Sequence, residues 1–262
     1  MRILLTNDDG ISSPGITLLA KALREAGHRV FIVAPDSNRS GCSHSINFLW
    51  GPQKLKKIED DTFSCSGTPV DCVIIALLGG IPELRISTED GGLDLEKAPD
   101  LVLSGINAGA NMGTDIIYSG TAAAARQGSL FGIPSVALSL VESEIPYQWD
   151  TVIAYIMENL ALIMGYWKAG TFINVNFPNI DKKQPSELVN AFPSIRCYND
   201  FIVTFTAPHG GVYCFAKPGQ TTSPCEGGKP EDGSDWAEVL KNNAALSVVL
   251  SQPAVVQAWK TG

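Results

Sequence analysis

Short apolar runs and amphipathic stretches alternate along the first 179 residues of the chain. The apolar runs at residues 3–5, 29–34, 101–103, 135–140 and 172–175 have the length and composition of buried strands. Between them, apolar residues recur at helical spacing. The predicted helices cover residues 14–26, 69–77, 122–131 and 151–164. This alternation predicts an α/β fold in which a mostly parallel sheet carries helices on both faces.

The pattern changes after residue 179. Short β-prone runs between residues 192 and 217 surround Pro208-His209-Gly210-Gly211, which predicts a hairpin. Gly, Pro and Ser dominate residues 218–235 and predict an extended loop, and residues 244–250 predict a late strand. We therefore divide the chain into a core at 1–179 and a C-terminal hairpin and tail at 180–262.

Composition and charge narrow the function classes. Hydrophobic residues make up 45% of the 262 residues, which is enough for a large buried core. The net charge of −8 argues against a nucleic-acid partner, since such proteins favour a basic surface. No run approaches the roughly 20 apolar residues of a membrane span, and the N-terminus lacks the pattern of a signal peptide. We therefore expect a cytoplasmic protein without a membrane partner.

Several familiar enzyme classes lack their motifs here. The chain contains no G-x-x-x-x-G-K-[ST], no G-x-G-x-x-G after the first strand and no G-x-S-x-G. The six cysteines show no C-x-x-C spacing and there are only three histidines, so a zinc site is poorly supported. His44 is a candidate acid or base, but a packing role is favoured. Asp71 is interpreted as an acid in the first turn of a helix.

Oxygen-bearing side chains gather in three loops that follow apolar runs. The loops cover residues 7–10, 36–45 and 104–121, and the carboxyl ends of parallel strands share one edge of a sheet. The candidate ligands are Asp8, Asp9, Ser40, Asn107, Asn111, Ser119 and Thr121. Carboxylate, amide and hydroxyl oxygens suit a hard cation such as Mg²⁺ or Mn²⁺. Gly10 allows a sharp turn directly after the paired acids.

The Ser119-Gly120-Thr121 turn predicts an anion site beside this cation. With Thr121 as the N-cap, a helix from Ala122 offers free backbone N–H groups and the positive end of its dipole. Arg39 adds a guanidinium from the second loop. A cation beside an anion site favours phosphoryl chemistry. The alternative is a Gly-rich connector whose polar residues only cap helices.

The motifs, taken in order, resemble the survival protein SurE family of metal-dependent 5′/3′-nucleotidases. The resemblance runs from residue 1 to about residue 179. It is carried by Thr6-Asn7-Asp8-Asp9-Gly10, Ala34-Pro35-Asp36 with Ser40-Gly41, Ser66-Gly67-Thr68-Pro69, Ser104-Gly105-Ile106-Asn107-Ala108-Gly109 with Asn111 and Gly113, and Tyr118-Ser119-Gly120-Thr121. The tail beyond Pro218 departs most from the family pattern. Asn47 and a long insertion at 84–97 also differ.

The resemblance implies roles for particular residues. The divalent metal ligands would be Asp8, Asp9, Ser40 and Asn107. The substrate phosphate would contact Ser40, Gly41, Asn111, Ser119, Gly120 and Thr121, and the catalytic group would be Asp8, Asp9, Asn111 and Ser119. One Mg²⁺ or Mn²⁺ per subunit is implied. So are a Rossmann-like three-layer αβα catalytic core and a C-terminal extension that exchanges between subunits, giving homodimers or homotetramers.

The expected reaction is hydrolysis of nucleoside 5′- and 3′-monophosphates to nucleoside and phosphate, with polyphosphate as a further substrate in some family members. A rival mechanism makes Asp8 a nucleophile that forms an aspartyl-phosphate. A rival of another class is a nucleotide- or phosphate-binding sensor without turnover.

Overall fold

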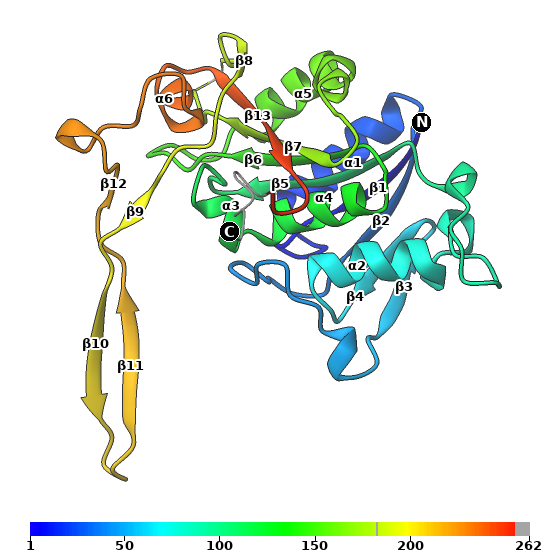
Figure 1. Cartoon of the computed structure of the whole chain (residues 1–262), viewed down its shortest axis with the longest axis horizontal. Coiled ribbons are helices and arrows are strands. Elements are labelled where there is room, and N and C mark those ends of the chain that lie inside the picture. The colour runs from blue at the N-terminus through cyan, green and yellow to red at the C-terminus, as the bar shows by residue number, and fades with distance from the viewer. Residues whose placement is uncertain (182, 255–262) are drawn as a thin grey trace, which may run out of the picture.

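A nine-stranded sheet forms the centre of the computed structural model, which describes residues 1–181 and 183–254 (Figure 1). The strand order is β3-β4-β2-β1-β5-β6-β7-β13-β8. The six strands from β4 to β7 in this order all run parallel. They are β1 (Arg2–Thr6), β2 (Arg29–Pro35), β4 (Thr62–Cys65), β5 (Leu101–Ala108), β6 (Ser135–Leu140) and β7 (Thr171–Phe177). The predicted mostly parallel sheet is confirmed.

Helices cover both faces of the sheet. Alternate side chains of β1 point to opposite faces, since Ile3 and Leu5 pack with α1 (Pro14–Glu25) and α5 (Trp149–Gly165). Leu4 packs on the other face, against residues of α2 (Pro69–Ile75) and α4 (Gly120–Leu130). The three-layer αβα arrangement is therefore confirmed.

Both edges of the sheet depart from the parallel pattern. The exposed strand β3 (Leu55–Glu59) runs antiparallel to β4. At the other edge, β13 (Ala244–Leu250) runs antiparallel to β7 and parallel to β8 (Leu188–Asn190). Both β8 and β13 lie beyond residue 179, so the central sheet continues past the boundary expected from the sequence.

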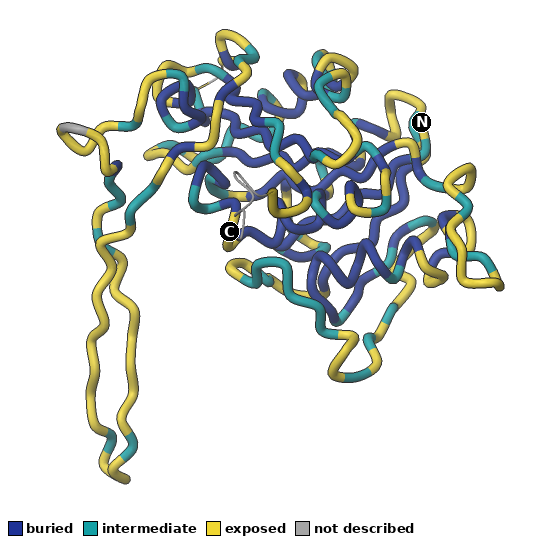
Figure 2. The backbone as a smooth tube through the Cα atoms, viewed as in Figure 1, coloured by how far each residue is buried: buried dark blue, intermediate teal, exposed yellow. Residues whose placement is uncertain are grey.

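A long two-stranded arm projects from the body of the protein (Figures 1 and 2). Its strands β10 (Phe201–Thr206) and β11 (Val212–Lys217) pair antiparallel around the predicted Pro208-His209-Gly210-Gly211 turn. Every residue of both strands is exposed. The predicted hairpin is confirmed. Its base is a short pair of strands, β9 (Cys197–Tyr198) and β12 (Thr221–Thr222).

Several short elements were not predicted from the sequence. They include the helices α3 (Asp115–Tyr118) and α6 (Asp235–Leu240), the 3-10 turns Phe48–Trp50, Pro82–Leu84, Leu95–Lys97 and Glu226–Gly228, and a π-turn at Ala76–Gly80. The described residues contain no helix that is both long and apolar enough to cross a membrane.

Candidate functional site

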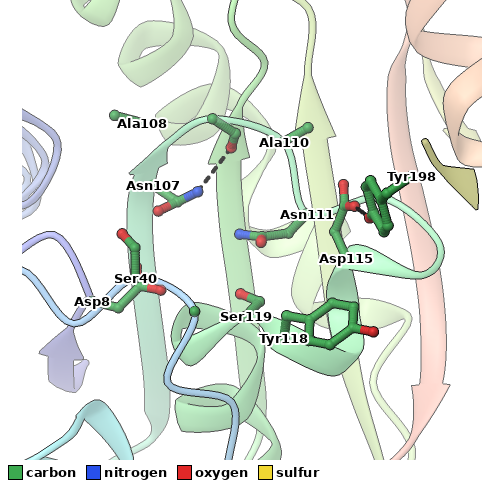
Figure 3. A pocket seen from close by; sticks show the side chains of 12 residues that line it. Asp8, Ser40, Asn107, Ala108, Ala110, Asn111, Asp115, Tyr118, Ser119 and Tyr198 are labelled. Atoms are coloured by element: carbon green, nitrogen blue, oxygen red, sulfur yellow. Dashed lines mark hydrogen bonds between the residues drawn. The ribbon is translucent and has the colours of Figure 1, made fainter. Parts of the chain in front are cut away.

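A cavity of about 290 Å³ opens where β1 and β5 end (Figure 3). Six residues singled out from the sequence line it: Asp8, Ser40, Gly41, Asn107, Asn111 and Ser119. The lining also includes Ala108, Gly109, Ala110, Asp115, Tyr118 and Tyr198, to which the sequence analysis gave no role in the site. The three loops therefore do converge. Asp9, Gly120 and Thr121 are not part of this lining, but hydrogen bonds join Asp9 to Ala108 and join Gly120 and Thr121 to Asp8.

Asp8 is buried and tied to the first turn of α4. Its Oδ2 accepts hydrogen bonds from the backbone N–H groups of Gly120 (3.1 Å) and Thr121 (3.2 Å), and its Oδ1 accepts one from Thr121 Oγ1 (2.6 Å). Burial raises the pKa of Asp8, and these hydrogen bonds oppose the rise. In this structure the helix N-terminus therefore faces a carboxylate of the protein itself.

The cap of α4 differs from the sequence prediction. The helix begins at Gly120, and Ser119 is the N-cap because its Oγ accepts a hydrogen bond from the Ala122 N–H at 3.0 Å. Thr121 lies inside the first turn and turns its hydroxyl to Asp8. The assignment of Thr121 as the cap is therefore wrong.

Asp9 lies beside Asp8 at the end of β1 and is partly buried. Its Oδ2 accepts a hydrogen bond from the Ala108 N–H at 3.0 Å. Burial raises the pKa of Asp9 to about 6, and the nearby Asp8 adds to the rise. A cation between the two groups would offset both effects, because it stabilises the ionised form of each carboxyl group.

Asn107 stands at the end of β5, which runs to Ala108 and is longer than the predicted strand. Its Nδ2 donates to the Gly109 carbonyl at 2.9 Å, and in Figure 3 the amide oxygen points toward Asp8 and Ser40. Within residues 1–181 and 183–254, no three His, Cys, Asp or Glu side chains cluster in a way that could hold a metal. Two carboxylates with neutral amide and hydroxyl oxygens fit a hard divalent cation.

Asn111 lines the cavity and is held in place by four hydrogen bonds. Its backbone N–H donates to Asn176 Oδ1 (2.8 Å), and its carbonyl accepts from the side chains of Asn174 (2.8 Å) and Asn176 (3.1 Å). Its Nδ2 donates to Ser139 Oγ at 2.8 Å. The sequence shows Asn174 and Asn176 at the period of two that places both on one face of β7, which is the signal that could have revealed them.

Comparison with known proteins places the chain in a family. Residues 3–198 match the family model described as survival protein SurE. The chain belongs to this family. Its fold resembles the crystal structure of the SurE protein from Aquifex aeolicus, with a TM-score of 0.78 at 31% identity, over 97% of this chain and 95% of that one.

Curated relatives in the SurE family match at higher identity. The chain is 45% identical over 182 residues to a protein of Stenotrophomonas maltophilia strain K279a and 43% identical over 182 residues to one of Xanthomonas axonopodis pv. citri. Both relatives are named 5′-nucleotidase SurE. The matched stretch covers 69% of this chain and 64% of the length of each relative.

The other residues considered from the sequence lie outside the cavity lining. The Arg39 guanidinium donates to the Ser66 carbonyl (2.8 Å) and to Asp36 (3.2 Å), so it does not supply the expected charge to the cavity. His44 lies 2.9 Å from Gln127 Oε1 through its Nε2, and burial lowers its pKa. Asp71 completes a capping box with Thr68, as its interpretation as a first-turn acid implied.

A second group of polar residues joins the C-terminal extension to the cavity lining. The Asp115 carboxylate forms an ion pair with Arg196 and accepts a hydrogen bond from the Tyr198 hydroxyl. Burial raises the pKa of Asp115, and the Arg196 guanidinium opposes the rise. The backbone N–H of Arg196 also donates to Thr114 Oγ1 at 2.9 Å. Local sequence patterns gave no sign of this link, since its partners are about 80 residues apart.

Proposed function

We propose that this protein is a divalent-metal-dependent phosphomonoesterase that hydrolyses nucleoside 5′-monophosphates, and nucleoside 3′-monophosphates as well. The observation that carries the proposal is that Asp8 and several neutral oxygens line one cavity, with Asp9 hydrogen-bonded to Ala108 of the same lining. The names of the 42–45% identical relatives point to the same activity.

The residues that would hold one Mg²⁺ or Mn²⁺ are Asp8, Asp9, Asn107 and Ser40. A bound divalent cation lowers the pKa of a coordinated water and offsets negative charge on a phosphoryl group. The chain contributes the orientation of these ligands. Thr121 and the first turn of α4 fix Asp8, and the Ala108 N–H fixes Asp9.

Asn111 and Ser119 are proposed to bind the phosphate oxygens. Ser119 Oγ accepts one hydrogen bond at the helix cap, which leaves its hydroxyl proton for a phosphate oxygen. Asn111 gives one amide proton to Ser139, which leaves the second for the cavity. Both donors are fixed before substrate arrives, as transition-state stabilisation requires. Gly41 and Ser40 extend this polar surface across the cavity.

We favour attack by water over attack by Asp8. Both Asp8 oxygens already accept hydrogen bonds from the start of α4, and three such bonds stabilise the carboxylate and reduce its nucleophilicity. Asp9 accepts a hydrogen bond from the Ala108 N–H through Oδ2, which leaves Oδ1 as the better candidate to position or deprotonate the water. Failure to trap a phosphorylated enzyme with ³²P-labelled AMP supports this choice, whereas a stoichiometric aspartyl-phosphate would establish the rival.

Self-association through the arm is the second part of the proposal. The arm exposes a large set of apolar side chains: Phe201, Ile202, Val203, Phe205, Val212, Tyr213 and Phe215. An exposed apolar hairpin of this kind favours burial against another chain. We therefore propose a homodimer or homotetramer in which the arms contact a second copy.

The activity is tested by phosphate release from AMP, GMP, 3′-AMP and polyphosphate with Mg²⁺, with Mn²⁺ and with EDTA. We expect release from the nucleotides with either metal, none with EDTA, and recovery when metal is restored. Tight AMP binding without phosphate release under every metal condition would instead identify a sensor.

A further inference from the structure

We propose that Tyr118 and Tyr198 form the nucleoside subsite of this protein, with their rings contacting the base and ribose of a bound nucleoside monophosphate. This inference rests on the proposed function, and it assigns part of the substrate site to the C-terminal extension. Both tyrosines line the same cavity as Asp8, Asn107, Asn111 and Ser119.

The order of groups across the cavity matches the order of groups in a nucleotide. In Figure 3 the oxygen ligands Asp8, Ser40 and Asn107 lie on one side, with Asn111 and Ser119 between them and the two tyrosines. A phosphate held at the centre would therefore direct its ester group either toward the proposed metal ligands or toward the aromatic side. Only the aromatic side offers apolar ring surface to a nucleoside.

The two rings are placed and exposed as a binding surface needs. Their centroids lie 6.4 Å apart with the planes at 71°, so the pair presents a ring face and a ring edge. Tyr118 is 55% exposed and Tyr198 is 38% exposed. Rings in a closed apolar core would not be accessible to a ligand, whereas these are.

Tyr198 is held in this position by its hydroxyl group. That group donates to Asp115, and the same carboxylate pairs with Arg196 and accepts from the Met112 N–H at 3.2 Å. Three of the roughly four acceptor sites of the Asp115 carboxylate are therefore occupied, which leaves little capacity to read the edge of a base. Recognition by ring contact alone accepts every base, since each has a π-face. The subsite is thus expected to accept adenine and guanine nearly equally.

A second aromatic pair in the protein lies away from the residues proposed to bind the phosphate. Tyr147 and Trp149 have ring centroids 5.0 Å apart and line a separate cavity of about 350 Å³ with Leu18, Gln148, Asp150 and Thr151. Neither Asn111 nor Ser119 lines that cavity. The geometry therefore favours the tyrosine pair over this one for the nucleoside.

Steady-state kinetics with matched substrates tests the proposal. AMP carries a nucleoside, whereas glycerol 2-phosphate carries the same phosphomonoester without one. For Tyr198→Ala we expect the KM for AMP to rise about tenfold with kcat within about threefold, and both constants for glycerol 2-phosphate to stay within about twofold. Tyr118→Ala should behave in the same way. Tyr198→Phe keeps the ring but loses the hydrogen bond to Asp115, so its KM for AMP should lie between those of the wild type and Tyr198→Ala, with both constants for glycerol 2-phosphate again within about twofold.

Calorimetry on the Mn²⁺-loaded protein provides a second readout. Tyr198→Ala should weaken binding of a phosphonate analogue of AMP, which has no ester bond to hydrolyse, about tenfold and leave binding of inorganic phosphate unchanged. An equal loss for AMP and glycerol 2-phosphate, or no loss for either, would overturn the subsite. If the wild type hydrolyses neither substrate with metal present, the proposed function fails, and selective loss of AMP binding in calorimetry still decides the subsite.

Discussion

Asp8 connects two features that the sequence analysis predicted separately. One is a cation site at the paired acids Asp8 and Asp9, and the other is an anion site at the start of the helix that follows Ser119. In the structure the two meet, because the Asp8 carboxylate accepts hydrogen bonds from the Gly120 and Thr121 N–H groups. The helix dipole therefore stabilises the charged form of a proposed metal ligand. Gly120 is required there, since a Cβ at this position would lie 2.9 Å from Asp8 Cβ and from Cys42 Sγ.

Thr121→Val tests this arrangement with a nearly isosteric change. Valine removes the 2.6 Å hydrogen bond from Thr121 Oγ1 to Asp8 and preserves the shape of the side chain. Loss of a partner that orients a metal ligand typically weakens metal binding by about 10- to 100-fold. We expect that loss in a Mn²⁺ titration followed by electron paramagnetic resonance. Thr121→Ser keeps the hydroxyl and should bind like the wild type; a Val variant that also does so would contradict the assigned role.

The raised pKa of Asp9 predicts a pH dependence of stability in the metal-free protein. The folded-state pKa of about 6 exceeds the unfolded value of about 3.9, so the folded state binds this proton more tightly. The resulting stability is complete below about pH 4 and is lost as the pH rises through about 6. Calorimetric Tm values of metal-free protein should therefore fall more steeply over this window than those of Asp9→Asn. Parallel Tm profiles for the two proteins would show that Asp9 does not titrate as assigned.

At the scale of elements, the start of α4 connects helix stability with the site. Ser119 caps this helix and also lines the cavity, whereas Ser234 caps α6 outside that lining through a 3.3 Å bond to the Ala237 N–H. The sequence placed the helix to within two residues, but both Ser119 and Thr121 are good capping residues. The tertiary hydrogen bond from Thr121 Oγ1 to Asp8 engages the threonine hydroxyl, and Ser119 is the residue that caps the helix. Local sequence patterns do not contain that information.

Ser119→Ala and Ser234→Ala form a matched pair of cap deletions. Each should cost about 1 kcal/mol of folding free energy, which lowers the Tm by roughly 2–4 °C in a protein of this size. Phosphate release from AMP should fall at least about tenfold only in Ser119→Ala, because only that variant loses a proposed phosphate donor. Equal activity in the two variants, measured at matched folded fractions, would remove Ser119 from the site.

At the scale of the whole molecule, the parallel sheet and its helices were predictable because their apolar periodicity is strong. Strands β2, β6 and β13 fall close to the expected ranges. The ring of Tyr198 and its bond to Asp115 were not predictable, because they depend on a tertiary contact across 83 residues. The family model ends at residue 198, yet the fold similarity to the Aquifex protein covers 97% of the chain. The structural similarity therefore extends beyond residue 198, where the match to the family model ends.

The exposed aromatic side chains of the arm predict that the protein self-associates in a concentration-dependent way. Phe205 stacks between Tyr213 and Phe215 at centroid distances of 5.3 and 5.6 Å, and all three rings remain about half exposed. Because the rings are already about half buried, covering the exposed half against a second copy stabilises association by roughly 1 kcal/mol each. In sedimentation equilibrium we expect Phe205→Ser/Phe215→Ser to be monomeric and the arm control Thr206→Ser to assemble like the wild type. An unchanged oligomer in the double variant would show that the arm is not the contact.

The central claim is that Asp8 and Asp9, at the loop that follows β1, hold a hard divalent cation. Isothermal titration of Mn²⁺ into the wild type and Asp9→Asn tests it most directly, because the asparagine keeps the shape of the side chain and removes its charge. The account predicts one site per chain in the wild type and at least about 100-fold weaker binding in the variant, with an unchanged circular dichroism spectrum. Wild-type stoichiometry and affinity in Asp9→Asn would contradict it.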